Sequence, residues 1–148
     1  KKGGDGYNAI TLDELAIKHS FYNDVNIIKI DTDGHDFDVI LGSVETITNN
    51  LPFILFECDA FNNLNYIEIC LETLNLFKKL SYNYFLLYDN FGNLMGKYSL
   101  GNLEPFENLL FYQLTSNFYY FDILIIKDDD LKRFYQNEIV YTYILNSS

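Results

Sequence analysis

Apolar runs alternate with segments of helical apolar spacing along the first part of the chain. The run from Val25 to Asp31 predicts a strand, and its apolar character predicts burial on both faces near the centre of a parallel sheet. From His35 to Asn50 the apolar residues recur every three or four positions, which predicts one helix. Phe53 to Glu57 is a second apolar run and a second strand. This order of strand, helix and strand is typical of a parallel crossover unit.

After this unit the pattern becomes antiparallel. Tyr84 to Tyr88, a turn and Leu94 to Tyr98 predict a hairpin, and Tyr119 to Lys127 predicts a last strand. We therefore expect a single α/β domain over residues 1–148, in which the parallel unit is followed by an antiparallel, hairpin-like C-terminal part. The segments expected to be helical are Thr11 to His19, Tyr66 to Leu80, Leu131 to Gln136 and, helical or irregular, Leu103 to Tyr112.

Acidic residues follow both strands of the crossover unit. Asp31 and Asp33 come at the end of the first strand, and Glu57 ends the second. Because ligands of open α/β sheets bind outside the carboxyl ends of the strands, we expect these carboxylates to line one cleft. A carboxylate held there can be a general base, a metal ligand or a partner for a cationic ligand. Gly34 indicates a sharp turn or a close approach of a ligand to the backbone.

Simpler structural roles compete for the same residues. Asp33 and Asp36 are candidate helix caps, since Asp accepts hydrogen bonds from the first N–H groups of a helix. His35 could relay a proton, but a solvent-facing place in the first helical turn explains it as well. Glu57 either lies in the cleft, which we favour, or is a buried charge that needs a partner such as Lys29.

Composition narrows the classes of partner. The net charge is -11 with only 10 Lys and Arg, which argues against electrostatic binding to nucleic acid or to an anionic membrane. A cationic or neutral ligand suits this surface better. No apolar run is long enough to span a bilayer, so we expect a soluble, cytoplasmic protein. Cys58 and Cys70 offer neither metal-ligand spacing nor a disulfide framework and are expected to be packed thiols.

Four motifs follow one another along the chain: Thr11-Leu-Asp-Glu-Leu, Ile28-Lys-Ile-Asp-Thr-Asp-Gly-His-Asp-Phe, Leu41-Gly-Ser and Pro52-Phe-Ile-Leu-Phe-Glu. In this order and at these distances they resemble the FkbM-type S-adenosylmethionine-dependent methyltransferases. The resemblance implies a partial Rossmann-like, class I methyltransferase sheet, with the four strands side by side as the fourth, fifth, seventh and sixth of that fold. It also implies S-adenosylmethionine as cofactor and a sugar or other small hydroxyl compound as methyl acceptor.

The resemblance also suggests roles for individual residues. Asp31 and Glu57 would flank the acceptor as catalytic residues, and Asp31, Asp33 and Gly34 would contact the cofactor, with no metal assigned to the site. Two features depart from the family: Asp33 stands where Glu is usual, and no glycine-rich turn and ribose-binding acid precede Thr11. We therefore expect this chain to be the C-terminal portion of a methyltransferase domain, with its first strand at a bare edge of the sheet. By itself, this portion should bind the cofactor weakly and be inactive.

Two other interpretations remain open. In a haloacid-dehalogenase-like, Mg-dependent phosphohydrolase, Asp31 would be the nucleophile and Asp33 the acid/base, with Asp128 and Asp129 as a later acid pair. His35 and Glu57 do not fit the pattern of that superfamily. The other interpretation is a non-catalytic α/β interaction domain.

Overall fold

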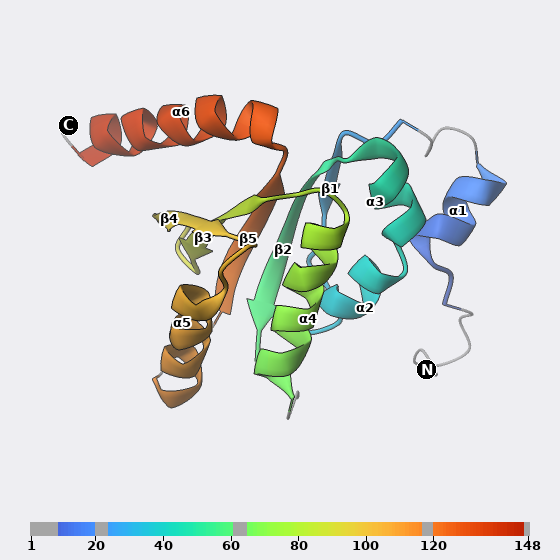
Figure 1. Ribbon diagram of the computed structural model, residues 1–148, viewed down its shortest axis with the longest axis horizontal. Helices are drawn as coiled ribbons and strands as arrows, with labels where there is room; N and C mark the ends of the chain where they lie inside the picture. The colour runs from blue at the N-terminus through green and yellow to red at the C-terminus, as the bar shows by residue number, and fades with distance from the viewer. Residues whose placement is uncertain (1–8, 20–23, 61–64, 117–119, 147–148) are drawn as a thin grey trace.

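The computed structural model describes residues 9–19, 24–60, 65–116 and 120–146. Over these ranges the strands form one five-stranded sheet in the order β1-β2-β5-β3-β4 (Figure 1). β1 and β2 pair in parallel, and every other neighbouring pair is antiparallel. This confirms the α/β fold and places β1, β2, β5 and β3 in the order expected from the methyltransferase resemblance. The strands are β1 (Ile27–Lys29), β2 (Phe53–Asp59), β3 (Tyr84–Asp89), β4 (Leu94–Ser99) and β5 (Tyr120–Ile126).

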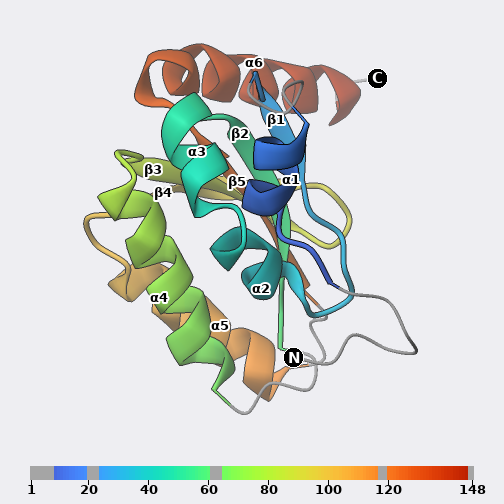
Figure 2. The ribbon, with the colours of Figure 1, turned by 90° about the vertical axis from the view of Figure 1, so that its right-hand side faces the viewer.

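Helices cover the two faces of the sheet unequally. Ile54, Phe56 and Cys58 alternate along β2 and pack into the main core with α2 to α5. On the other face, which we call the α6 face, Leu55 and Leu124 belong to a smaller cluster with the start of α6. Figures 1 and 2 show α6 running across the end of the sheet where β5 finishes. The described helices are α1 (Leu12–Lys18), α2 (Asp36–Leu41), α3 (Val44–Asn50), α4 (Tyr66–Lys79), α5 (Glu104–Thr115) and α6 (Asp128–Asn146).

The single helix predicted over His35 to Asn50 is wrong, because α2 and α3 are separated at Gly42 and Ser43. Ser43 is fully buried and its hydroxyl donates to the carbonyl of Val39 at 2.6 Å. A Cβ on Gly42 would lie 3.1 Å from the Thr11 Cγ2 atom, so the chain leading into α1 packs directly on the break. Tertiary contact thus ends a helix that the local apolar spacing would have continued.

The first strand is shorter and more exposed than predicted. β1 spans three residues and lies at the edge of the described sheet, not at its centre. Ile28 is 9% exposed, whereas Ile27 on the opposite face is 68% exposed, so burial on both faces is wrong. Flanking hydrogen bonds from Ile30 N to the Leu55 carbonyl (2.8 Å) and from Phe53 N to the Asn26 carbonyl (2.9 Å) extend the pairing with β2.

The last helix is longer than predicted. It runs from Asp128 to Asn146 instead of from Leu131 to Gln136, and the three acids Asp128, Asp129 and Asp130 form its first turn. Negative charge there stabilises the positive end of the helix dipole. The segment from Leu103 to Tyr112, predicted to be helical or irregular, corresponds to helix α5.

Candidate active site

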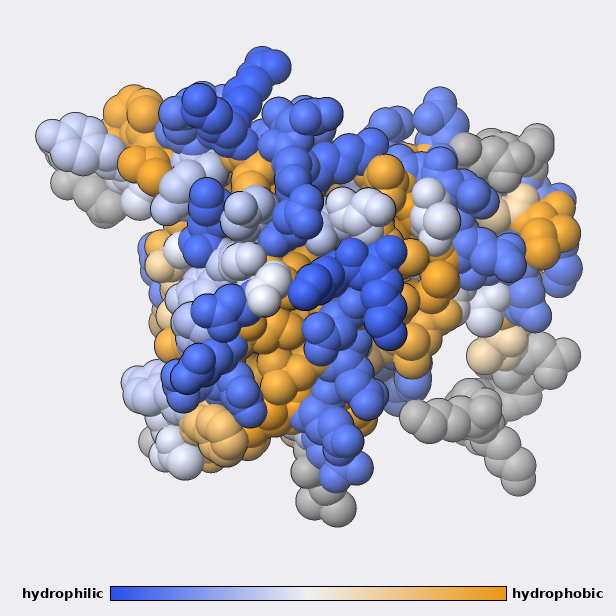
Figure 3. Space-filling model, in the orientation of Figure 1, coloured by the Kyte–Doolittle hydropathy of each residue, from blue (hydrophilic) through white to orange (hydrophobic). Residues whose placement is uncertain are grey.

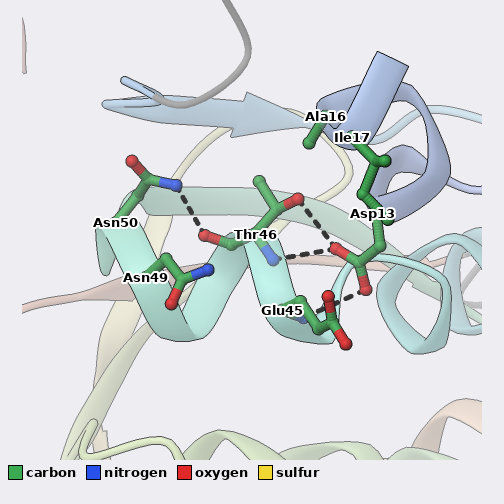
Figure 4. Close-up of a pocket in the computed structure, with 7 residues that line it drawn as sticks. All are labelled: Asp13, Ala16, Ile17, Glu45, Thr46, Asn49 and Asn50. Atoms are coloured by element: carbon green, nitrogen blue, oxygen red, sulfur yellow. Dashed lines mark hydrogen bonds between the residues drawn. The ribbon is translucent and has the colours of Figure 1, made fainter. Parts of the chain in front are cut away.

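The Thr-Leu-Asp motif has a structural role that the sequence did not predict. The Asp13 carboxylate accepts hydrogen bonds from the backbone N–H groups of Glu45 (3.0 Å) and Thr46 (2.8 Å) and from the Thr46 hydroxyl (2.7 Å) (Figure 4). Asp13 therefore caps α3 from a neighbouring helix, since the first N–H groups of a helix have no partner within it. This cap holds α1 against α3, and Asp13 also lines a pocket of about 310 Å³ between the two helices.

A larger pocket of about 480 Å³ lies on the α6 face of the sheet. Asp31, at the exit of β1, and Glu57, in β2, both line it, as the sequence predicted. Its apolar lining includes Leu55, Leu124 and Phe134. The pocket therefore combines carboxylates with an apolar floor beside the only parallel strand pair of the described sheet.

Asp33 and Gly34 lie in the loop after β1 and are not among the residues that line this pocket. Both have left-handed backbone conformations, with φ of 49° at Asp33 and 91° at Gly34. Glycine adopts such angles without strain, and Asp tolerates them better than most residues. The predicted sharp turn is confirmed. His35 is the N-cap residue of α2, exposed as expected, and its Nδ1 lies 3.8 Å from an Asp38 oxygen.

Asp36 connects the loop after β1 with β2. It is only 2% exposed, and its Oδ2 accepts from the Thr32 hydroxyl at 2.8 Å and from the Thr32 N–H at 3.3 Å. Its Oδ1 accepts from the backbone N–H of Glu57 at 3.1 Å. The prediction that Asp36 caps the next helix is therefore wrong. These bonds satisfy a buried carboxylate and hold the loop after β1 against β2, where Glu57 is positioned.

Lys29 pairs with Asp31 and not with Glu57. Its Nζ lies 2.6 Å from Asp31 Oδ2, and both side chains are more than half exposed. The hydrogen bond and the charge of Asp31 raise the pKa of Lys29, and Glu57 raises it slightly further. The alternative in which Glu57 is a buried charge paired to Lys29 is therefore not what the structure shows.

Asp122 is a third carboxylate of the pocket, which the sequence did not reveal. It lies directly opposite Glu57 in the pairing of β2 with β5, and opposite Tyr88 in the pairing of β3 with β5. Burial raises the pKa of Glu57, and the nearby charges of Asp31 and Asp122 raise it further. Burial likewise raises the pKa of Asp122, although Lys29 opposes this effect. The signal that could have identified Asp122 in the sequence is that an acid interrupts the apolar run of β5.

A family model for the methyltransferase FkbM domain matches residues 6–84, which is more than half of the chain. This chain belongs to the FkbM methyltransferase domain family. The matched segment contains Asp31, Asp36 and Glu57 and ends where β3 begins, so Asp122 lies outside it. The comparisons with curated proteins and with solved structures gave no match. None of the helices in the described part of the chain is long and apolar enough to cross a membrane.

Proposed function

We propose that this FkbM domain transfers a methyl group from S-adenosylmethionine to a hydroxyl of a sugar or another small polar acceptor. The family match supports a methyltransferase in general. The observation that carries the proposal further is the meeting of Asp31 and Glu57 in one pocket of about 480 Å³ at the parallel strand pair. In open α/β sheets, ligands bind beside the carboxyl ends of such strands.

Asp31, Asp33 and Gly34 are the residues proposed to lie against the cofactor. S-adenosylmethionine supplies a methyl group activated by a positively charged sulfonium, and the carboxylates of Asp31 and Asp33 are suited to a cation. Both acids are exposed at the exit of β1. The left-handed turn at Asp33 and Gly34 presents a loop backbone that a ligand can approach closely.

Glu57 is proposed as the general base that removes the proton of the acceptor hydroxyl. A base works best when its pKa lies near the working pH, and the pKa of Glu57 is raised by burial and by the surrounding carboxylates. Asp31 is held by Lys29 at 2.6 Å and is better suited to stabilise positive charge. The apolar floor formed by Leu55, Leu124 and Phe134 would contact the less polar face of the acceptor.

We also propose that further strands of the parent domain pair with β1 and complete the cofactor site. β1 pairs only with β2 among the described residues, and Ile27 is 68% exposed. An open apolar edge of this kind favours pairing with another strand. The 148-residue chain by itself should therefore bind S-adenosylmethionine weakly or not at all, and calorimetry that finds tight binding would overturn this part of the proposal.

The proposed activity can be tested on the longest native chain that contains these residues. Labelled S-adenosylmethionine is offered with a panel of saccharides, and methylated product is expected with the wild type and with the control Glu72→Gln, a substitution at an exposed acid of α4. Asp31→Asn should lose most of the product. Mg-dependent phosphatase turnover that disappears in Asp31→Asn, without any methyl transfer by the wild type, would instead support the phosphohydrolase interpretation.

A further inference from the structure

The two cysteines of the chain are in direct contact inside the main core. Cys58 lies in β2 and Cys70 in α4, and their Sγ atoms are 2.8 Å apart. Both residues are fully buried, and both thiols are free. A disulfide needs a sulfur separation of about 2.05 Å, so a sulfur movement of under about 1 Å would allow the bond to form.

The polar groups around the sulfurs have hydrogen-bond partners whether the cysteines are reduced or oxidised. The Tyr66 hydroxyl lies 3.1 Å from Cys58 Sγ, 2.8 Å from the Cys58 carbonyl and 2.6 Å from Gln113 Oε1. Gln113 Nε2 also donates to the Cys58 carbonyl at 3.2 Å. If the Cys58 thiol were oxidised, the Tyr66 hydroxyl would still have two oxygen acceptors. Oxidation therefore leaves no buried polar group without a hydrogen bond in this network.

We propose that Cys58 and Cys70 form a modification site, in which an intrachain disulfide joins β2 to α4 when the chain folds in the presence of a low-molecular-weight disulfide such as oxidised glutathione. One cysteine thiolate attacks oxidised glutathione, breaks its S–S bond and releases one glutathione. The second cysteine thiolate then attacks the mixed disulfide and releases the other glutathione. The two cysteine thiol protons pass to the two glutathione thiolates that are released, the S–S bond of oxidised glutathione is replaced by the Cys58–Cys70 bond, and glutathione is the species reduced.

The folded protein should exchange this bond slowly in both directions. Burial and the neighbouring Cys58 raise the pKa of the Cys70 thiol well above its usual range, so little reactive thiolate is present. A surface pocket of about 570 Å³ lies between α4 and α5, and Figure 3 shows apolar surface between the polar outer sides of these helices. Tyr66 lines that pocket and lies between it and Cys58. The reaction is therefore expected during folding, before the sulfurs are enclosed.

The test compares the chain refolded with oxidised and reduced glutathione and the chain refolded with reductant alone. After maleimide labelling in denaturant, the first sample should carry no label and weigh about 2 Da less than the reduced chain. Its melting temperature should be about 10 °C higher, as expected for a short cross-linked loop in a chain of this size. The matched control Cys70→Ser should keep one labelled thiol and show no such shift.

Two labelled thiols in the glutathione-refolded wild type, or a cross-link between chains, would overturn the proposal. Equal melting temperatures for oxidised and reduced wild type would also contradict a bond that joins β2 to α4. If Cys70→Ser does not fold, the wild-type comparison alone decides the outcome, because it needs no substitution. The result does not depend on the proposed methyltransferase activity.

Discussion

Replacing Asp122 by Asn should stabilise the protein at neutral pH. Asp122 and Glu57 are directly opposite each other on adjacent antiparallel strands, and both carboxyl groups have a raised pKa. Like charges in that position destabilise a sheet, because each is held beside the other in a partly dehydrated site. Asn has nearly the same shape as Asp, so the substitution removes the charge and leaves the packing of β5 unchanged.

The expected gain follows from the distance between the two side chains and from solvent screening. Side chains directly opposite in a sheet are about 5 Å apart, and two unit charges at that distance repel by about 1 kcal/mol in a water-like dielectric. Both groups are partly exposed, which keeps the effective value near this lower limit. Attraction between Asp122 and Lys29 is also lost in the variant. We therefore expect Asp122→Asn to raise the free energy of unfolding by about 0.5–1 kcal/mol at pH 7.

The gain should depend on pH. A carboxyl group whose pKa is raised by folding favours the native state at low pH, and this contribution is lost as the pH rises through the raised pKa. The wild type should therefore lose stability relative to Asp122→Asn between about pH 4 and pH 7. Urea unfolding followed by circular dichroism at both pH values measures this difference, with Glu72→Gln, a substitution at an exposed residue of α4, as the control. An Asp122→Asn variant that is less stable than the wild type at pH 7, or a difference independent of pH, would refute the reasoning.

Four other substitutions, at three residues, test the contacts of Asp13, Asp36 and Glu57. Asp13→Ala should lower the free energy of unfolding by about 1–2 kcal/mol in urea, because the first turn of α3 loses its cap; an unchanged value would contradict the capping role. Asp36→Ala should cost about 2–3 kcal/mol, since the Glu57 N–H and the Thr32 hydroxyl lose a buried acceptor. Asp36→Asn should recover part of that loss in the same assay, and equal losses for both variants would contradict the hydrogen-bonding role. Glu57→Gln should raise stability at pH 7 while methyl transfer falls, and a parallel loss of both would indicate a structural role for Glu57.

Two pocket acids were predictable because their signals are local, and the strand order was predictable from the resemblance to a family. The apolar runs that end at Asp31 and Glu57 identify two strands, and the parallel pairing of β1 with β2 brings these acids to one pocket. The prediction that Glu57 ends its strand is wrong, because β2 continues to Asp59. The motif order of the family then predicted the neighbours of β2 in the sheet, which the structure confirms. In the structure, burial alternates along β2 and places Glu57 and Phe56 on opposite faces of the sheet, which the apolar run did not predict.

The features that were missed depend on residues distant in the sequence. Asp13 caps a helix that begins more than 30 positions later, and nothing near it distinguishes it from an ordinary exposed acid of a first helical turn. The break at Gly42 results from contact with Thr11, although the apolar spacing continues through it. Asp122 becomes part of the pocket only through the register of β5 against β2. Apolar periodicity within one segment carries no information on these contacts.

The most direct test of the proposed active site is the methyl transfer rate of Glu57→Gln in the longest native chain that contains the domain, measured together with the affinity for S-adenosylmethionine. We predict that the rate constant falls at least about 100-fold, as expected for loss of a general base, while the dissociation constant of the cofactor changes little. The control Glu72→Gln, at an exposed residue of α4, should match the wild type in both quantities. A Glu57→Gln enzyme that transfers methyl groups at the wild-type rate would contradict the assignment of this pocket as the active site.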